Sequence, residues 1–165
     1  TELHQTLSPS MDISVSSNFE RLMFDLYESD GVKINALMQQ FNREAINLNG
    51  AAMKKARALF SSASIDDQAT CDIIANTYNT MGYLLDPHSA TGVGAARICN
   101  KDPAQPMVIL ATAHPAKFPA AIEKADINIS ATVPAHMSDL FEREERFTVL
   151  SNDKASVNQF MIDQL

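Results

Sequence analysis

The sequence predicts a helix-rich α/β fold, and three patterns within its 165 residues support that prediction. Apolar residues recur at helical spacing through most of positions 1–81. One uninterrupted apolar run, 107–111, is partly β-branched and is typical of a fully buried strand in a covered sheet. Helical spacing returns after that run. The length fits one domain or part of a larger one, and we expect two segments, 1–81 and 82–165.

The first segment is predicted to hold one short strand followed by packed helices. Residues 11–15 alternate apolar and polar side chains, as in a strand with one buried face. Asn18 is the expected N-cap of the first helix, Asp30 of the second and Ser64 of the fourth. Gly82 should end the fourth helix. The apolar residues at helical spacing lie within 19–27, 34–41, 53–60 and 73–81 of these four helices.

The second segment begins with a helix rich in small side chains. Asp86 precedes a proline and must therefore be extended. The next residues, 88–96, have the length of a helix but include Gly92 and Gly94, which cost about 1 kcal/mol each relative to alanine. Tolerance of that cost indicates close approach by a neighbouring backbone or a ligand. The glycine pair is not a dinucleotide fingerprint, because Arg97 stands where the third glycine belongs.

The carboxyl end of the predicted buried strand is the best candidate for a ligand edge. Ligands of open α/β sheets lie outside the carboxyl ends of strands. Thr112 and His114 follow the apolar run directly and are its best-placed polar groups. After them we expect a helix over 115–125, a weak extended segment over 127–133, a short helix over 137–141, a strand over 147–150, and a terminal helix capped by Ser151 or Asn152.

Composition and charge exclude several functional classes. Apolar residues make up 45% of the chain, so a packed core is expected. The net charge of −7 and the lack of a basic cluster, apart from a short run at 54–57, argue against nucleic-acid binding. We expect no membrane partner, no metal site and a cytoplasmic location, since no long apolar stretch or clustered ligands occur. Cys71 and Cys99 are isolated and are expected to be reduced.

Five motifs together resemble a known enzyme family. Asp86-Pro87-His88-Ser89-Ala90-Thr91-Gly92-Val93 and Leu110-Ala111-Thr112-Ala113-His114-Pro115-Ala116-Lys117-Phe118 are similar to the C-terminal part of threonine synthase. Three further stretches, 7–13, 16–22 and 143–150, resemble the same family in the same order. The resemblance is to the long form of bacteria and fungi, and it runs along nearly the whole chain.

The resemblance implies a pyridoxal-phosphate enzyme of the tryptophan-synthase β-like fold, fold type II. The substrate would be O-phospho-L-homoserine, and the products L-threonine and phosphate. The Schiff-base lysine and the glycine-rich loop for the cofactor phosphate would lie N-terminal to the matched region. The missing N-terminal part of the same chain is therefore an expected partner. This stretch alone would carry no catalytic residue and be inactive.

The resemblance also assigns roles to individual residues. Thr112 would lie beside the pyridine nitrogen of the cofactor, where a hydroxyl can donate a hydrogen bond without bringing negative charge. His114 and Ser89 are further candidates for cofactor binding, and Ser89 stands where the family often has threonine. Lys117 and His88 are candidates for substrate binding. Asn18 and Arg21 are weaker candidates for substrate contact, with a helix cap and a salt bridge as the alternatives.

Two other readings of the sequence remain open. The chain may be read as a non-catalytic relative that keeps this region as a binding or assembly module. It also fits an independent small helical binding domain, which would have a self-contained core and no open apolar face. A portion of a larger sheet would instead expose such a face.

Overall fold

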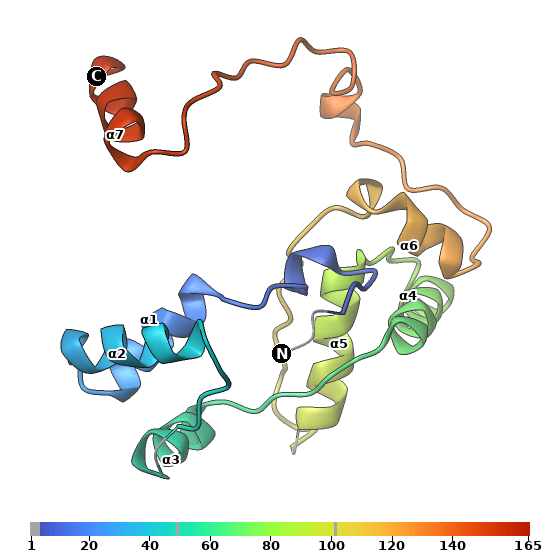
Figure 1. Ribbon diagram of the computed structural model, residues 1–165. Coiled ribbons are helices and arrows are strands. Elements are labelled where there is room, and N and C mark those ends of the chain that lie inside the picture. The colour runs from blue at the N-terminus through green and yellow to red at the C-terminus, as the bar shows by residue number, and fades with distance from the viewer. Residues whose placement is uncertain (1–3, 49, 101) are drawn as a thin grey trace. The chain divides into compact units, whose positions relative to one another are not determined.

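The computed structural model describes residues 4–48, 50–100 and 102–165, and Figure 1 shows their helices. The chain divides into two compact units, one reaching to Thr132 and one over Val133–Leu165. Every regular element of the described residues is a helix. The predicted helix-rich character is confirmed, whereas the predicted strands are absent from these residues.

Three helices of the first unit share one apolar cluster. They are α1 (Ser17–Leu26), α2 (Gly31–Phe41) and α3 (Gly50–Leu59). Their buried side chains are Met23, Leu26, Ile34, Met38 and Ala52. Those of α1 and α2 recur at the predicted spacing, whereas Leu59 and Phe60, expected on the apolar side of the third helix, are exposed. The apolar stripes of these helices therefore form a core, as amphipathic helices do.

The helices around the candidate site contribute side chains to a second apolar cluster of the first unit. It involves α4 (Asp67–Met81), α5 (Pro87–Cys99) and α6 (Pro119–Lys124), the last of which follows a 3-10 turn, η2 (Pro115–Lys117). Ile74, Ala90 and Ile122 are almost completely buried in this cluster. Packing against α4 thus fixes α5, whose small side chains contribute little helix amphipathicity.

The two glycines of α5 are closely approached, but by side chains and not by the backbone or ligand that was predicted. A Cβ at Gly94 would lie 2.8 Å from Ile73 Cδ1 and 2.9 Å from Ile65 Cδ1. A Cβ at Gly92 would lie 3.3 Å from Ile109 Cγ2. The glycines therefore let α5 approach three isoleucine side chains. These belong to Ile73 of α4, to Ile65 just before α4 and to Ile109 of the apolar run 107–111.

Helix boundaries follow the predicted pattern, with different residues at three caps. Asp30 caps α2 as predicted, and Gly82 ends α4 with a left-handed φ of 66°. The predicted caps Asn18, Ser64 and Ser151 or Asn152 are wrong. The N-caps are Ser16 for α1, Asp66 for α4 and Asp153 for α7.

None of the three predicted strands is present among the described residues. Residues 9–11 instead form a 3-10 turn, η1 (Pro9–Met11), and 107–111 and 147–150 carry no regular structure. The run expected to be fully buried is exposed, since Val108 and Leu110 are 82% and 75% exposed. A strand needs a neighbour that accepts and donates its backbone hydrogen bonds. No such neighbour lies among the described residues.

The second unit contains one α-helix and one 3-10 turn. The turn is η3 (Ala135–Met137), where a short helix over 137–141 was predicted, and the helix is α7 (Lys154–Asp163). Arg143 and Asp139 form an exposed ion pair, in which Arg143 Nη2 lies 2.6 Å from Asp139 Oδ1. The arginine beside Asp139 lowers the pKa of that carboxyl below its ordinary value.

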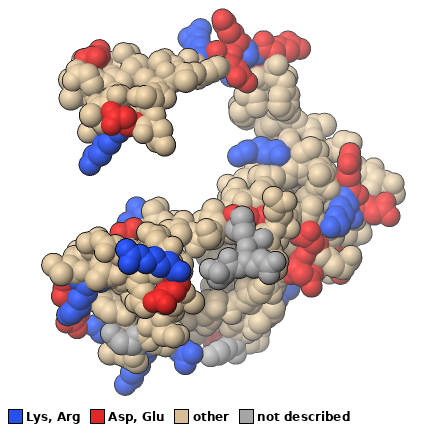
Figure 2. Space-filling model, in the orientation of Figure 1, with Lys and Arg blue, Asp and Glu red and all other residues tan. Residues whose placement is uncertain are grey.

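The described residues contain no helix that is both long and apolar enough to cross a bilayer. Within the same residues, no group of three or more His, Cys, Asp or Glu side chains is placed to hold a metal ion. On the face shown in Figure 2, basic side chains are interspersed with acidic ones rather than gathered in one patch. Cys71 and Cys99 are free thiols, as predicted.

Candidate functional site

The candidate site is a cleft of the first unit beside the N-terminus of α5. It has a volume of about 380 Å³. One wall comes from the residues before and at the start of α5, and another from the segment that leads from the exposed apolar run to η2. Its polar lining includes Asp86, Ser89, His114, Ser130 and Thr132. The motifs 86–93 and 110–118 therefore meet at this cleft.

Asp86 organises the start of α5. Proline at the first helical position requires an extended residue before it, and Asp86 has a ψ of 161°. Its carboxylate accepts hydrogen bonds from the backbone N–H groups of His88, at 2.9 Å, and Ser89, at 3.3 Å. Asp86 is only 1% exposed. A buried carboxylate at this position satisfies two free N–H groups of the helix and interacts favourably with its dipole.

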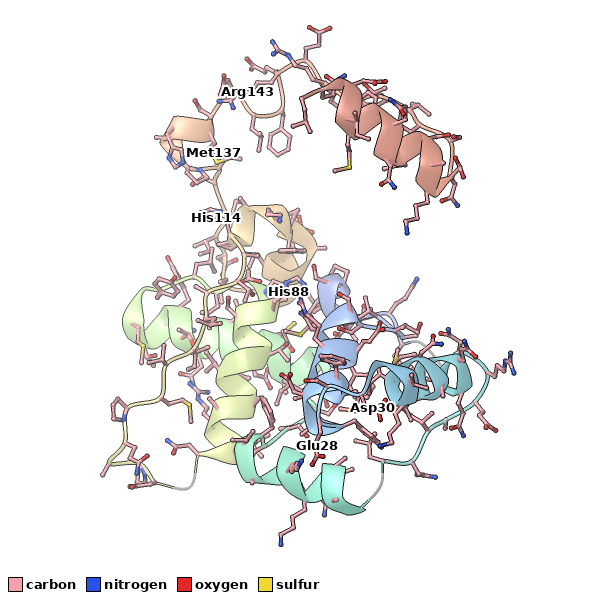
Figure 3. The ribbon with its side chains drawn as sticks, turned by 90° about the vertical axis from the view of Figure 1, so that its left-hand side faces the viewer. Glu28, Asp30, His88, His114, Met137 and Arg143 are labelled. Atoms are coloured by element: carbon pink, nitrogen blue, oxygen red, sulfur yellow. The ribbon has the colours of Figure 1, made fainter. Side chains whose placement is uncertain are left out.

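The imidazole of His88 lies buried between three groups (Figure 3). Its Nδ1 lies 2.9 Å from Asp86 Oδ1, and its Nε2 accepts the backbone N–H of Ser10 at 3.1 Å. The ring packs on Phe118 with centroids 4.5 Å apart. Because Nε2 is an acceptor, a neutral ring carries its proton on Nδ1 and donates it to Asp86. His88 thereby ties the segment near Ser10 to the start of α5.

Ser89 connects the two motifs directly. Its hydroxyl donates a short hydrogen bond to Asp86 Oδ2, and it accepts the backbone N–H of Thr112 at 3.2 Å. Ser89 is 2% exposed. The end of the apolar run is therefore attached to α5 through one buried hydroxyl.

The structure brings some predicted site residues together and separates others. Ser89 and His114 line the cleft, and Thr112 is an exposed residue between the lining residues Ala111 and Ala113. Neither His88, which is buried, nor Lys117, which is exposed, is among the lining residues. The Lys117 ammonium lies 5.8 Å from the ring centre of Phe118.

His114 has a local structural contact in addition to its place at the cleft (Figure 3). Its Nδ1 accepts the backbone N–H of Ala116 at 3.2 Å, which caps η2. Nε2 has no hydrogen bond within the described residues, and the side chain is exposed. The ring can therefore offer its second nitrogen to a ligand without losing the cap.

The weaker candidates Asn18 and Arg21 lie elsewhere. They hydrogen-bond to each other one turn apart on α1, and Arg21 borders a separate shallow pocket with Ser17, Glu20, Phe24 and Ile34. None of the residues lining the main cleft comes from α1. This contact is neither of the predicted alternatives, because Ser16 is the N-cap of α1 and Arg21 donates to the uncharged amide oxygen of Asn18.

Sequence reasoning missed the central role of Asp86. It identified the extended backbone before Pro87 but not the cap that this backbone allows. The signal was present, because aspartate followed by proline is the combination that favours N-cap and first-turn positions. The long-range bond from Thr112 to Ser89 had no sequence signal, since 23 positions separate the two residues.

Shifted pKa values lie away from the cleft. Burial raises the pKa of the Cys71 thiol, which belongs to the apolar core under α5. That shift keeps the thiol protonated and argues against a nucleophilic role. The hydrogen bond and charge of Lys55 lower the pKa of Glu28, an exposed residue after α1 (Figure 3).

Comparison with known proteins identifies relatives over nearly the whole chain. Residues 89–161 match the family model described as threonine synthase, C-terminal. Threonine synthase of Pseudomonas aeruginosa is 51% identical over 160 residues, which are 96% of this chain and 34% of that protein. Threonine synthase of Corynebacterium glutamicum is 34% identical over 171 residues, covering 99% of this chain and 35% of its own length.

Two solved structures share the arrangement. The structure of pyridoxal-phosphate-bound threonine synthase from Brucella melitensis superposes with a TM-score of 0.80 at 40% identity, covering 97% of this chain and 34% of that one. Yeast threonine synthase gives a TM-score of 0.74 at 26% identity, with 99% and 38% covered. This chain thus spans about a third of the length of these relatives. The resemblance predicted from the motifs is confirmed: the chain is similar to a C-terminal portion of threonine synthases.

Proposed function

We propose that the complete protein containing this chain is a threonine synthase. It would convert O-phospho-L-homoserine and water to L-threonine and phosphate, with pyridoxal phosphate as cofactor. The observation that carries the proposal is the identity of 51% to the Pseudomonas enzyme over 96% of this chain. The motif that includes Ser89 and the motif that includes Thr112 also meet at one cleft, as residues of one site must.

The residues at the cleft fit one side of the cofactor. Within the part of the chain that the structure describes, the Thr112 hydroxyl has no hydrogen-bond partner, so it is free to donate one. Among the described residues, the cleft lining includes no lysine or arginine, so we propose that the N-terminal part of the complete protein holds the cofactor phosphate. Pyridoxal phosphate supplies an electron sink for the carbanions of elimination chemistry.

Thr112 is proposed to donate its hydroxyl hydrogen bond to the pyridine nitrogen of the cofactor. A hydroxyl leaves that nitrogen neutral, because it brings no negative charge to hold a proton there. The ring is then a milder electron sink than one paired with an aspartate. Support comes from the position of Thr112, whose backbone is attached to α5 while its side chain is exposed.

The other candidates are proposed with the contacts they already have. His114 and Ser89 would form part of the cofactor wall, since both line the cleft. Lys117 would attract the substrate phosphate from its exposed position beside Phe118. His88 would need to release Asp86 or the Ser10 N–H before it could contact substrate, so a supporting role suits it better than direct contact.

The fold of the complete protein is proposed to be fold type II with a tryptophan-synthase β-like sheet. In it, the exposed apolar run 107–111 would pair as a strand with the N-terminal part of the same protein. The exposure of Val108 and Leu110 supports this pairing, because contiguous exposed apolar residues mark surfaces that become buried. The cytoplasmic location stays a prediction.

The test uses the complete protein. We expect it to bind pyridoxal phosphate and to release phosphate from O-phospho-L-homoserine with formation of threonine. Thr112→Val should lower kcat by about tenfold or more, because one hydrogen bond is lost in the transition state. Binding without phosphate release would favour the non-catalytic binding module. Failure to bind the cofactor would overturn the proposal.

A further inference from the structure

We propose that Asp86 and Ser89 are positioning residues that hold Thr112 in place through a chain of buried hydrogen bonds. The inference rests on the proposed function, in which the Thr112 hydroxyl contacts the cofactor. It assigns Asp86 a role that the family motifs did not give it. It also makes Ser89 chiefly an anchor for the backbone of Thr112.

The polarity of the chain follows from the chemistry of its members. A serine hydroxyl has one proton and two lone pairs. Because the proton of Ser89 goes to Asp86 Oδ2, its lone pairs remain for the backbone N–H of Thr112, 3.2 Å away. Asp86 and Ser89 are 1% and 2% exposed. Water is thus kept from competing for these bonds, and the orientation of the hydroxyl is set by the carboxylate.

The carboxylate is fully engaged. Oδ1 accepts from the backbone N–H and the ring Nδ1 of His88, each at 2.9 Å, and Oδ2 accepts from the backbone and hydroxyl of Ser89. Four donors match the acceptor capacity of an ionised carboxylate and offset the cost of burying it. With His88 held by the Ser10 N–H, Oδ1 is occupied and Oδ2 is left to Ser89.

The bond to Ser89 is the tether of the segment that carries Thr112. Among the described residues, the backbone of 107–113 makes no hydrogen bond with another backbone group. The N–H of Thr112 is bound to α5, while its side chain stays exposed at the cleft. Moving this one contact would move the hydroxyl, and an error of about 1 Å at a reacting group can cost about 100-fold in rate.

The first experiment measures amide hydrogen exchange in the cofactor-free complete protein. Ser89→Ala should speed exchange of the Thr112 amide about fivefold to tenfold, as loss of a hydrogen bond of about 1 kcal/mol implies. Exchange of the Asn100 amide, which is bound to Ala96 O at the other end of α5, should not change. Thr91→Ala is the matched control, because the Thr91 hydroxyl bonds Pro87 O within the same helix.

Comparing exchange at the Thr112 and Asn100 amides distinguishes a positioning role of Ser89 from a general stabilisation of α5. If Ser89→Ala speeds exchange at Thr112 and Asn100 equally, the serine only stabilises α5 and the inference is overturned. No change at Thr112 also overturns it. Asp86→Asn should be at least as disruptive at Thr112, because an amide presents a donor to the N–H and O–H donors of α5. An unchanged Thr112 amide in Asp86→Asn would contradict the role of the carboxylate.

The second experiment links the tether to the cofactor. In the holoprotein, Ser89→Ala should lower kcat for phosphate release about tenfold with little change in KM, because the tether acts on the placement of a group in the chemical step. Thr91→Ala should leave kcat near that of the wild type. If exchange changes at Thr112 but kcat does not, the tether has no functional link and the inference fails. If the wild type binds no pyridoxal phosphate, the proposed function fails while the exchange result stands.

Discussion

Small residues in α5 allow close packing at the expense of helix propensity. Gly94 faces Ile65 and Ile73 at distances that leave no room for a Cβ. Glycine costs about 1 kcal/mol of helix propensity relative to alanine. The space gained lets the helix approach α4, and this keeps Ser89 and Asp86 buried near the cleft.

Gly94→Ala is therefore expected to destabilise the protein despite the better helix propensity of alanine. The added methyl would overpack against two isoleucines, a strain of about 1–3 kcal/mol. Gly31→Ala in α2 is the control, because a Cβ there meets nothing within 4 Å. Chemical denaturation measures both. A gain in the free energy of unfolding for Gly94→Ala, similar to that of Gly31→Ala, would contradict the packing account.

The roles of single residues were partly readable from the sequence. The pattern placed Thr112 and His114 at the end of an apolar run, and the structure brings this end to the start of α5. The bonds from Ser10 to His88 and from Thr112 to Ser89 were not readable, because they join positions far apart in the chain. Hydrogen bonds of that kind depend on tertiary packing rather than on local periodicity.

Helices were predicted well because their signals are local. Spacing of apolar residues and one capping residue suffice to define α2, whose Asp30 accepts the backbone N–H of Lys33 at 3.0 Å (Figure 3). Strands were predicted poorly because pairing is not local. The run 107–111 has the composition of a buried strand, but the described residues provide no neighbour for it.

The N-cap of α2 makes a testable contribution to pH dependence. The backbone N–H of Lys33, and then its side chain, lower the pKa of Asp30 below its ordinary value. A carboxyl with a lowered folded pKa stabilises the protein above its unfolded pKa of about 3.9, and that stabilisation disappears as the pH falls through the folded value. Asp30→Asn keeps an acceptor at every pH. We expect the wild type to lose more unfolding free energy than Asp30→Asn on acidification from about pH 5.

Denaturant titrations at a series of pH values check this expectation. The difference between wild type and Asp30→Asn should shrink as the pH falls below the ordinary aspartate range. Parallel curves for the two proteins would show that the Asp30 carboxylate gains nothing from the cap. The side chains of Asp30 and Lys33 are exposed, so salt can screen the attraction between their charges. Added salt should therefore weaken the contribution of the Lys33 charge to the lowered pKa of Asp30, but not that of the backbone hydrogen bond.

At the scale of the whole molecule, this chain has apolar surface that its own described residues do not cover. Met107, Val108 and Leu110 are all exposed, as are Phe147 and Val149 in the second unit. Two apolar clusters form good cores, but neither covers these segments. This pattern favours a portion of a larger fold over an independent small binding domain.

The isolated chain is expected to self-associate through this surface. Val108→Lys with Leu110→Lys should lower both the association constant and the binding of a dye that reports exposed apolar surface, because charge on an unpaired edge opposes pairing. Sedimentation over a concentration series measures the first effect. A wild-type chain that stays monomeric and binds no dye would support the independent binding domain instead.

The charge state of the cofactor ring tests the central claim most directly. In the complete protein loaded with ¹⁵N-labelled pyridoxal phosphate, the pyridine nitrogen should have the chemical shift of a neutral, hydrogen-bonded nitrogen. Thr112→Asp should move that shift to the protonated range, because a carboxylate beside the nitrogen holds a proton there. A wild-type nitrogen that is already protonated, or a shift that Thr112→Asp leaves unchanged, would contradict the placement of the Thr112 hydroxyl at the ring.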